Sequence, residues 1–343
     1  MSEFNKQTKL LSTTKEDIQT AARIIKNGGL VCLPTETVYG LGANALNGEA
    51  VLNIFKAKGR ANDNPLIVHI AKFDDIKPLV KSVSEKAKIL AQKFWPGPLT
   101  MIFEKSSLIP DEVTCKMDTV AIRMPSHKVA RAIIEESGLP IAAPSANISG
   151  GVSPVTAEHC YADLKGRVDA IVDGGECEVG LESTVILMVG DKPRLLRPGF
   201  VTAEQISEQI GEIIIDDAIL NPLKKGQQVL SPGMKYKHYS PSAKVIIIDA
   251  DDEKYYSYVN QSQGEDVFAL CYDEDVEHIN KKCLTLGKHF DNESAANRLF
   301  YNLHQFDLMG AKVVFARLPK TDGVGLAVVN RLLRSAGFEV IKL

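Results

Sequence analysis

The side chains best suited to chemistry in this 343-residue chain are cations, hydroxyls and amides. They occur in short motifs that lie far apart in the sequence, and they include Lys58, Arg60, Arg123, Arg197, Thr35, Thr37, Ser145, Asn147 and Ser183. Residues of these types position a phosphate chain and neutralise its charge, and they do not suit covalent catalysis. The set therefore predicts a binding site for a polyanion.

Several common catalytic motifs are absent from the sequence. There is no P-loop, no G-x-S-x-G and no H-E-x-x-H motif. Residues 40–45 match the G-x-G-x-x-G/A pattern of dinucleotide-binding folds, but six residues separate them from the preceding apolar run, which disfavours a nicotinamide enzyme. The six cysteines include no C-x-x-C pair, so we expect neither structural zinc nor a disulfide framework, only buried or incidental thiols.

The first polar cluster follows a predicted strand. The apolar run of residues 30–33 stops at Pro34, which cannot donate a hydrogen bond to a sheet. Thr35, Glu36 and Thr37 come directly after it, at the end of a strand, where α/β folds normally place ligand groups.

A predicted helix opens at Gly48 and runs into Lys58, Gly59 and Arg60, ahead of a strand at residues 66–70. Cations and asparagines between a helix end and a strand suit a polyanion. The plain alternative is a helix C-terminus whose cations offset the helix dipole. The residues of this segment alone do not decide between the two.

The segment from Thr119 to Met124, TVAIRM, predicts a strand with two distinct faces. Period-two geometry sends Val120, Ile122 and Met124 to one side and Thr119, Ala121 and Arg123 to the other. Thr119 and Arg123 then stand about 13 Å apart on one face, which suits two parts of one extended ligand. The alternative is a half-exposed strand with an exposed arginine.

The remaining patterns alternate between helices and strands. A capping box at residues 13–16 predicts a first helix, and further helices are predicted at residues 84–94 and 128–137. Strands are predicted at residues 168–172, 183–189 and 194–197. The hydroxyl-rich and glycine-rich loop at 144–153 can turn backbone N–H groups toward phosphate, or be a plain surface turn.

A second unit begins at about residue 243. Strand-like segments at 244–249, 267–272, 312–317 and 338–341 alternate with helical patterns, notably 294–309 and 326–336. This order predicts a small parallel α/β layer, to which no chemical motif can be assigned.

Composition favours an ordinary globular protein. The formal charge is −3, so no overall basic field indicates bulk nucleic-acid binding. No apolar run approaches the roughly 20 residues that span a bilayer, and residues 1–17 lack the apolar core of a signal peptide. We therefore expect a cytoplasmic protein without membrane association.

Six motifs, taken together, resemble the threonylcarbamoyl-AMP synthase family. They are PTETVYGLG, the Lys58-Gly59-Arg60 step, the Ser145-Ala146-Asn147 loop, GLESTV at 180–185, LRPG at 196–199 and SPGMKYKHYSP at 231–241. The resemblance implies an α/β fold, with a YrdC-like twisted open mixed sheet followed by a small Rossmann-like α/β/α domain. The domains implied are 12–212 (catalytic), 213–242 (linker and active-site lid) and 243–343 (C-terminal).

The resemblance also implies a reaction. L-threonine, bicarbonate and ATP give threonylcarbamoyl-adenylate and pyrophosphate, with magnesium accompanying ATP. Downstream threonylcarbamoyl transferase machinery then modifies an adenosine of tRNA. A carbamate oxygen is already a nucleophile, so the absence of an acid–base pair fits this chemistry. The alternative is an RNA-binding or tRNA-docking module without chemistry of its own.

Roles for individual residues follow from the resemblance. The residues expected around threonine are Thr37, His69, Arg123, Ala143 (through its backbone) and Ser183. Those expected to hold ATP are Arg60, Asn64, Thr119, Ser145, Ser153, Arg197 and Tyr236. The expected catalytic group is Lys58, Arg60, Ser145 and Asn147, and no metal ligands are assigned. Arg123 is expected to bind the threonine carboxylate, and Tyr236 to belong to a lid over the nucleotide.

Overall fold

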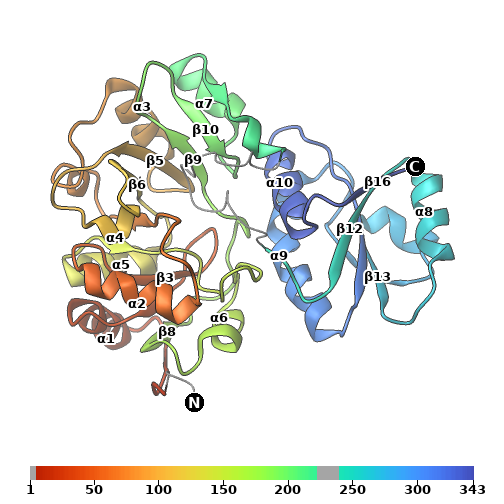
Figure 1. Cartoon of the computed structure of the whole chain (residues 1–343), viewed down its shortest axis with the longest axis horizontal. Helices are drawn as coiled ribbons and strands as arrows, with labels where there is room; N and C mark the ends of the chain where they lie inside the picture. The colour runs from red at the N-terminus through yellow and green to blue at the C-terminus, as the bar shows by residue number, and fades with distance from the viewer. Residues whose placement is uncertain (1–4, 222–238) are drawn as a thin grey trace.

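The computed structural model describes residues 5–221 and 239–343, which we name the N-terminal unit and the C-terminal unit. The N-terminal unit contains an 11-stranded sheet and the C-terminal unit a 5-stranded sheet. Figure 1 shows the two units side by side, each with its own helices, and the C-terminus on the far side of the second unit.

The larger sheet mixes parallel and antiparallel neighbours. Its strand order is β1-β8-β2-β3-β7-β4-β6-β5-β9-β10-β11. In chain order the strands are β1 (Lys9–Leu11), β2 (Val31–Leu33), β3 (Gly40–Asn44), β4 (Ile67–His69), β5 (Leu99–Glu104), β6 (Thr119–Arg123), β7 (Ile141–Ala142), β8 (Ala170–Val172), β9 (Thr184–Leu187), β10 (Arg194–Arg197) and β11 (Ile214–Ile215). β4 pairs with β6 in parallel, whereas β5 pairs with β6 antiparallel. The predicted mixed α/β sheet is confirmed.

Five of the seven α-helices of this unit, all but the fourth and the fifth, begin at a residue whose side chain caps the helix. The seven are α1 (Lys15–Lys26), α2 (Gly48–Lys58), α3 (Glu85–Phe94), α4 (Asp111–Thr114), α5 (Lys128–Ser137), α6 (Ala157–Leu164) and α7 (Ala203–Ile210), with short 3-10 turns at η1 (Phe73–Ile76) and η2 (Asp217–Ile219). The helix predicted at residues 84–94 is confirmed as α3, and Ser84 is its N-cap. The predicted cap of α1 is wrong by one residue, because Thr14 and not Thr13 accepts the hydrogen bond, from the backbone N–H of Asp17.

Strand β6 is buried on both faces. Val120 and Ile122 belong to the main core, while Ala121 packs in a second cluster with Ile67 and Ile102. The predicted two-faced strand is therefore confirmed. The alternative of an exposed arginine is wrong, since Arg123 is only 3% exposed.

The segment that matched a dinucleotide pattern is a strand. Residues 40–44 form β3, which pairs antiparallel with β2 and with β7. A dinucleotide loop joins a strand to a helix, so the pattern at 40–45 has no such counterpart here.

The smaller sheet is entirely parallel, as predicted. Its order is β14-β13-β15-β12-β16. The strands are β12 (Lys244–Asp249), β13 (Val267–Cys271), β14 (Lys282–Thr285), β15 (Val313–Arg317) and β16 (Val340–Lys342), and the helices are α8 (Asp252–Gln261), η3 (Asp273–His278), α9 (Asn292–Leu308) and α10 (Gly325–Ser335). The sequence analysis did not predict β14 or α8. In Figure 1, α9 and α10 lie on the side of this sheet that faces the N-terminal unit.

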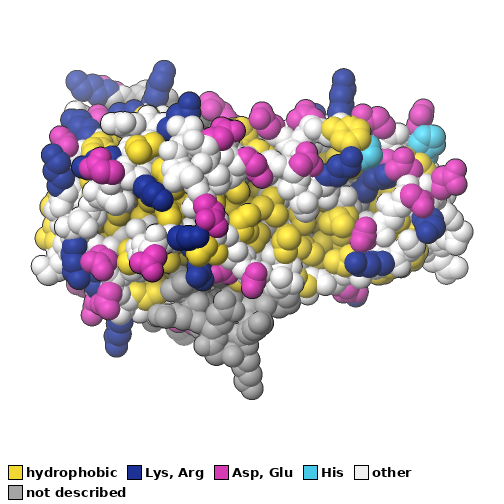
Figure 2. Space-filling view, turned by 90° about the horizontal axis from the view of Figure 1, so that it is seen from above, with side chains coloured by type: hydrophobic (Ala, Val, Ile, Leu, Met, Phe, Trp, Pro, Cys, Tyr) yellow, Lys and Arg dark blue, Asp and Glu magenta, His cyan; other side chains and the backbone are white. Residues whose placement is uncertain are grey.

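Charge is mixed over the surface. On the face drawn in Figure 2, basic and acidic side chains are interspersed over both units, with hydrophobic side chains between them. This face therefore has no field of a single sign. Within residues 5–221 and 239–343, no helix has both the length and the apolar character needed to cross a membrane.

The cysteines behave as the sequence predicts. All six are free. Cys32, Cys160, Cys177 and Cys271 are buried, and the other two are partly buried.

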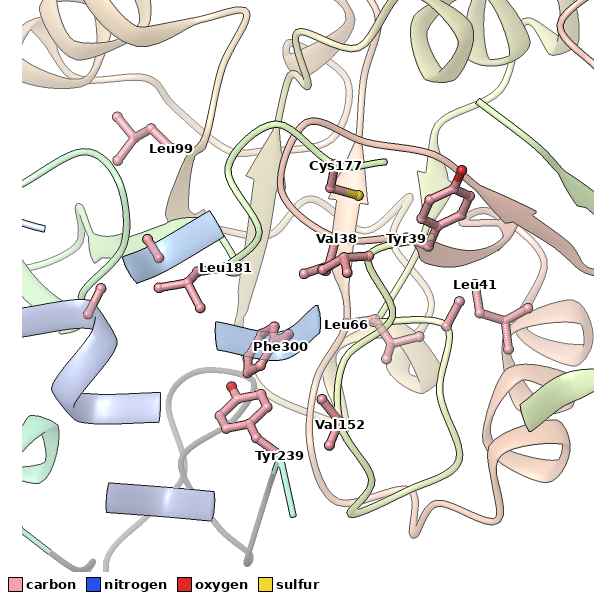
Figure 3. Packing of buried hydrophobic residues seen from close by; sticks show 14 of the residues in the cluster. Val38, Tyr39, Leu41, Leu66, Leu99, Val152, Cys177, Leu181, Tyr239 and Phe300 are labelled. Atoms are coloured by element: carbon pink, nitrogen blue, oxygen red, sulfur yellow. The ribbon is translucent and has the colours of Figure 1, made fainter. Parts of the chain in front are cut away.

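The two units share one continuous hydrophobic core. The cluster that contains Leu181 of the N-terminal unit also contains Phe300 of α9. Tyr239, the first described residue of the C-terminal unit, lies beside Phe300 with ring centroids 5.1 Å apart, as Figure 3 shows. Nearby, the Asn297 amide donates to the backbone oxygens of Cys177 and Glu178. The C-terminal unit is thus packed against the N-terminal one through α9.

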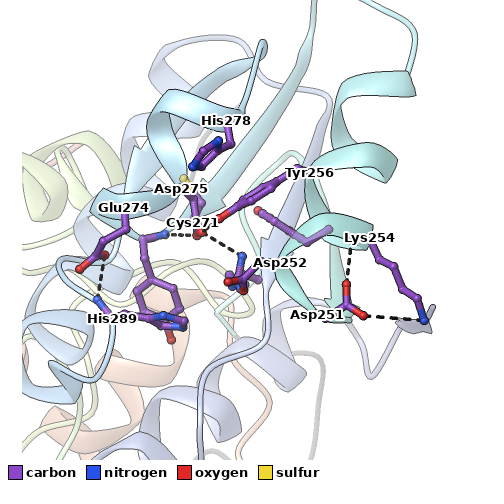
Figure 4. Close-up of polar contacts among 12 residues, drawn as sticks. Asp251, Asp252, Lys254, Tyr256, Cys271, Glu274, Asp275, His278 and His289 are labelled. Carbon is purple, nitrogen blue, oxygen red and sulfur yellow. Dashed lines mark hydrogen bonds and ion pairs between the residues drawn. The ribbon is translucent and has the colours of Figure 1, made fainter.

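The carboxyl ends of the parallel strands in the C-terminal unit meet an internal network of charges. Arg317, at the end of β15, donates to Asp275 at 2.9 Å and also pairs with Asp252. Tyr256 donates to the same Asp275 carboxylate at 2.8 Å, as Figure 4 shows. Parallel α/β sheets usually bind ligands at this edge. In this unit the charged and polar side chains at the edge form hydrogen bonds and ion pairs with one another.

Candidate active site

One cavity collects polar side chains from loops that are far apart in the sequence. The space between its walls, counted together with the part open to solvent, is about 600 Å³. The lining residues are Thr35, Thr37, Val38, Gly40, Arg60, Ile67, His69, Arg123, Ala143, Pro144, Ser145, Glu182, Ser183, Arg197 and Tyr239. They come mainly from the ends of β2, β4, β6, β7 and β10 and from the loops around them, which the mixed sheet brings together.

Arg123 stands at one end of this cavity, at the carboxyl end of β6. Its Nη1 donates to Thr37 Oγ1 at 2.8 Å, and its Nε donates to the Gly97 backbone oxygen at 3.3 Å. Its Nη2 lies 2.8 Å from Glu36 Oε1 in a buried ion pair. Burial by itself would raise the pKa of Glu36, but the Arg123 guanidinium outweighs it and holds that pKa below its usual value. Glu36 was not among the predicted site residues.

His69 is a neutral imidazole at the same end of the cavity. It lies beside Arg123 in the register of β4 with β6, and its Nδ1 is 3.2 Å from the Ile67 backbone oxygen. Burial and the neighbouring positive charge lower the pKa of His69 to about 3. The ring therefore stays uncharged near neutral pH. The N–H of Ala143 already donates to the Ile67 oxygen, so its carbonyl is the backbone group left for a ligand.

Ser183 and Arg197, which also line the cavity, form a hydrogen-bonded pair. Arg197 donates from Nε to the Ser183 backbone oxygen at 3.0 Å and from Nη2 to Ser183 Oγ at 3.2 Å. The Ser183 hydroxyl also lies 2.8 Å from Thr100 Oγ1. The β9–β10 hairpin holds the two residues in register, and burial lowers the pKa of Arg197 to about 10, which leaves it charged at neutral pH.

Arg60 reaches the cavity because α2 ends in a sharp turn. Gly59 has φ of 61°, a left-handed conformation that favours glycine, and it redirects the chain after Lys58. Arg60 Nη2 then donates to the Asn64 backbone oxygen at 2.9 Å, and its guanidinium lies over the Phe55 ring. Burial lowers the pKa of Arg60 to about 10, so it too remains a cation at neutral pH.

The Lys58 ammonium binds the loop that contains Ser145 and Asn147, and Lys58 itself does not line the cavity. Its ammonium lies 2.5 Å from the backbone oxygens of Ser145 and Asn147 and 3.4 Å from Asn147 Oδ1. The Ser145 hydroxyl donates to the same Asn147 oxygen at 2.6 Å. Burial and the charge of Arg60 lower the pKa of Lys58 to about 7. Three oxygen acceptors around one nitrogen oppose that shift, because they match the three donors of the protonated form.

The predicted residues divide into those that line the cavity and those that lie outside its lining. Thr37, Arg60, His69, Arg123, Ala143, Ser145, Ser183 and Arg197 line it. Lys58, Asn64, Asn147 and Ser153 do not line it, but each bonds to a residue that does. Thr119, at the start of β6, is not in the lining. Tyr236 lies outside the described residues.

Sequence analysis assigned no role to three residues at this site. Glu36 and Glu182 lie inside the PTETVYGLG and GLESTV motifs. A carboxylate would repel a polyanion, so its presence is explained only by its arginine partner, which the structure shows. Tyr239 lines the cavity from the C-terminal unit. It belongs to the motif at residues 231–241, in which Tyr236 was the tyrosine given a role.

The described residues contain no group of three or more His, Cys, Asp or Glu side chains placed to hold a metal ion. The carboxylates nearest the cavity, Glu36 and Glu182, are each within 2.8 Å of an arginine. These carboxylates therefore do not fit a metal site built from protein ligands.

Two family models match this chain. One, described as Telomere recombination (Sua5, YciO and YrdC), covers residues 23–199, and the other, described as Threonylcarbamoyl-AMP synthase, C-terminal domain, covers residues 201–337. The domain boundaries predicted from the sequence, 12–212, 213–242 and 243–343, remain a prediction.

Similar proteins extend over nearly the whole chain. The threonylcarbamoyl-AMP synthase of Pyrococcus abyssi is 44% identical over 335 residues, covering 95% of this chain and 96% of the relative. That of Bacillus subtilis is 44% identical over 340 residues, covering 97% and 96%. The crystal structure of P. abyssi Sua5 complexed with L-threonine matches with a TM-score of 0.90 at 43% identity, covering 98% of this chain and 100% of the other.

Proposed function

The chain belongs to the threonylcarbamoyl-AMP synthase family, and we propose that the cavity lined by Arg60, Arg123, Ser145 and Ser183 is its active site. It is an enzyme of the nucleotidyl-transfer type that uses L-threonine and ATP. The observation that carries the site assignment is the convergence of these four side chains, from four separate motifs, on one cavity.

We assign the Arg123 end of the cavity to threonine. A guanidinium binds a carboxylate through paired hydrogen bonds, and Arg123 is already held in place by Thr37 and Glu36. The neutral His69 adds no charge that would compete with it. The Ala143 carbonyl accepts from the threonine nitrogen. The solved P. abyssi structure with L-threonine supports this choice of ligand.

We assign the Arg60, Ser145 and Arg197 wall to ATP. Arg60 and Arg197 bring two positive charges to the cavity, and Lys58 holds the Ser145 loop from behind. A triphosphate needs such charge, and the hydroxyl of Ser145 supplies a donor. Arg60, Ser145, Lys58 and Asn147 stay the proposed catalytic group.

The reaction then requires alignment more than proton transfer. Bicarbonate and the amino group of threonine form a carbamate with loss of water. A carbamate oxygen attacks the α-phosphate of ATP, the bond to the β-phosphate breaks, and pyrophosphate leaves. The cations at the ATP wall stabilise the charge that develops on the phosphate oxygens. Bicarbonate as the third substrate is part of this proposal.

In this proposal magnesium would enter the site with ATP as part of the substrate, and no side chain of the described residues is assigned to hold it. Mg²⁺ usually binds nucleotide sites in that way, with few protein ligands. When bound, it would neutralise phosphate charge beyond what the arginines supply.

The product links the enzyme to tRNA modification. Threonylcarbamoyl-adenylate is a mixed anhydride, so a transferase acting on tRNA is proposed to consume it. We also place the enzyme in the cytoplasm, where ATP and tRNA occur, and its six free cysteines suit a reducing compartment. The alternative, an RNA-binding module, is disfavoured by the formal net charge of −3, which gives no overall basic field.

Purified protein incubated with ATP, bicarbonate and threonine tests the proposal. We expect the adenylate to be detected by mass, together with threonine-dependent pyrophosphate release without RNA. Reactions that lack threonine or bicarbonate serve as controls. If the complete mixture yields no adenylate, the proposed reaction is wrong. RNA binding that weakens steeply with added salt would favour the alternative.

A further inference from the structure

A buried ion pair connects the C-terminal unit to the cavity. Arg331 of α10 is fully buried, and its Nε donates to Glu182 Oε2 at 2.8 Å. Its Nη2 donates to the Glu182 backbone oxygen at 3.3 Å, and its Nη1 donates to Asn330 Oδ1 at 2.8 Å. Each guanidinium nitrogen of Arg331 therefore has an acceptor, and two of the three bonds cross from one unit to the other.

Glu182 connects Arg331 to the cavity. It lines the cavity, and its second carboxylate oxygen accepts a hydrogen bond from Ser153 Oγ at 2.6 Å. Ser153 is itself buried and belongs to the residues expected to hold ATP. The next residue, Ser183, is held by Arg197 from the other side. The orientation of residues 182 and 183 thus depends on one arginine from each unit.

The ion pair with Arg331 matters for ATP binding because Glu182 is negatively charged. A carboxylate in the wall of a pocket for ATP would repel the phosphates if it lacked a counter-charge. Burial by itself would raise the pKa of Glu182, but Arg331 and Arg197 outweigh it and keep the carboxyl ionised near neutral pH. Removing one partner of a buried pair leaves the other charge uncompensated, which costs more than the pair is worth.

We infer that Arg331 is a positioning residue for the reaction: through Glu182 it orients Ser153 and neutralises the carboxylate in the ATP wall of the cavity. This inference rests on the proposed function. It gives the C-terminal unit a part in the active site, to which sequence analysis could assign no chemistry. The Arg123–Glu36 ion pair at the threonine end lies within the N-terminal unit, whereas Ser183, also expected at threonine, directly follows Glu182.

The test compares Arg331→Met with wild type, Arg331→Lys, Glu182→Gln and the double variant Arg331→Met with Glu182→Gln. Initial rates of pyrophosphate release are measured against ATP and against threonine, and thermal unfolding reports whether each variant folds. The matched control is Asn297→Ala, which removes two other bonds between the units without touching a cavity residue.

We expect Arg331→Met to raise KM for ATP by more than about tenfold, as truncation within a buried charge pair usually does. KM for threonine should change less than KM for ATP, since Arg123 keeps its partners and Ser183 keeps its bonds to Arg197 and Thr100. Glu182→Gln should restore part of the ATP affinity in the Arg331→Met background, because no carboxylate is then left unpaired. Arg331→Lys should fall between wild type and Arg331→Met. A purely structural role would produce neither the difference between the two KM values nor the rescue.

The inference is overturned if folded Arg331→Met keeps the wild-type KM for ATP, or if Asn297→Ala raises it equally. It is also overturned if the double variant is no better than Arg331→Met. Should Arg331→Met fail to fold, Arg331→Lys takes its place, and a wild-type KM for ATP in folded Arg331→Lys would overturn the inference. Failure of the proposed function looks different, because wild type itself would then make no adenylate.

Discussion

Arg123 is shared between the ligand cavity and a protein carboxylate. Its guanidinium meets Thr37 and Glu36 as well as the space assigned to threonine. These contacts fix the orientation of the Arg123 side chain before a ligand binds, so the side chain loses little conformational entropy on binding. It also means that removing Arg123 has two effects, the loss of a ligand contact and an unpaired Glu36.

Arg123→Ala should raise KM for threonine by about 10- to 100-fold, the range for lost hydrogen bonds to a charged group. KM for ATP should change much less. Arg60→Ala is the matched comparison, and it should impair ATP use chiefly. Steady-state kinetics with each substrate varied in turn measure both.

Adding Glu36→Gln to Arg123→Ala separates the two effects of that substitution. The second change removes the unpaired carboxylate, so thermal stability should recover while threonine affinity stays low. Equal threonine affinity in wild type and Arg123→Ala would refute the assignment of this end of the cavity.

The β9–β10 hairpin is the element that positions Ser183 against Arg197. The two strands pair antiparallel with an irregular register between Leu195 and Arg197. Gly199 follows the hairpin, and a Cβ there would lie 2.4 Å from the backbone nitrogen of Thr184, the first residue of β9. This close approach of two backbones explains the glycine of the LRPG motif.

Gly199→Ala should therefore lower the free energy of unfolding by about 1–3 kcal/mol, the usual cost of overpacking. Activity should fall too, because the clash lies next to Ser183. Gly48→Ala is the control, since a Cβ at that position meets only the flexible side chain of Glu112. Chemical denaturation measures both variants. A Gly199→Ala protein as stable as Gly48→Ala would show that the hairpin can shift.

At the scale of the whole molecule, the junction between the units contains two stacked histidines. His159 of α6 and His304 of α9 lie with ring centroids 3.8 Å apart, and His304 Nε2 is 3.2 Å from the Ser153 backbone oxygen. Burial and the neighbouring His304 lower the pKa of His159 to about 3. Burial also lowers the pKa of His304, although Asp163 and Asp307 act in the opposite direction.

Acid should accordingly weaken the fold. In the folded protein, burial lowers the pKa of His69 and of His159 to about 3, from the ordinary histidine value of 6.5. As pH falls from 6.5 toward 3, the unfolded chain binds protons that the folded chain does not, so the free energy of unfolding falls. We expect Tm to drop by about 5 °C or more between pH 7 and pH 5.

His159→Gln should reduce that pH dependence, since one of the two histidines is removed. The exposed His278 of the C-terminal unit, changed to Gln, is the matched control and should leave the pH dependence as it is. Thermal unfolding at both pH values measures the effect. A Tm that is equal at pH 5 and pH 7 in wild type would contradict the prediction.

Several features could be predicted from the sequence because they depend on neighbours in the chain. The faces of β6 follow from alternation, the end of α2 follows from Gly59, and the parallel order of the C-terminal unit follows from alternating strands and helices. The family followed from six short motifs, and the comparisons confirm it. The site residues carried over with it lie in or next to one cavity, apart from Thr119 and the undescribed Tyr236, and their roles stay predictions.

Only the tertiary structure decided which charges are paired. Glu36 meets Arg123 across 87 positions, and Glu182 meets Arg331 across 149. No local pattern encodes such pairs, because whether a carboxylate is buried, and beside which cation, depends on how distant segments pack. The motifs determined what kind of chemistry the chain could perform. The packing of the two units determined that Arg331 of α10 pairs with Glu182, a residue that lines the cavity.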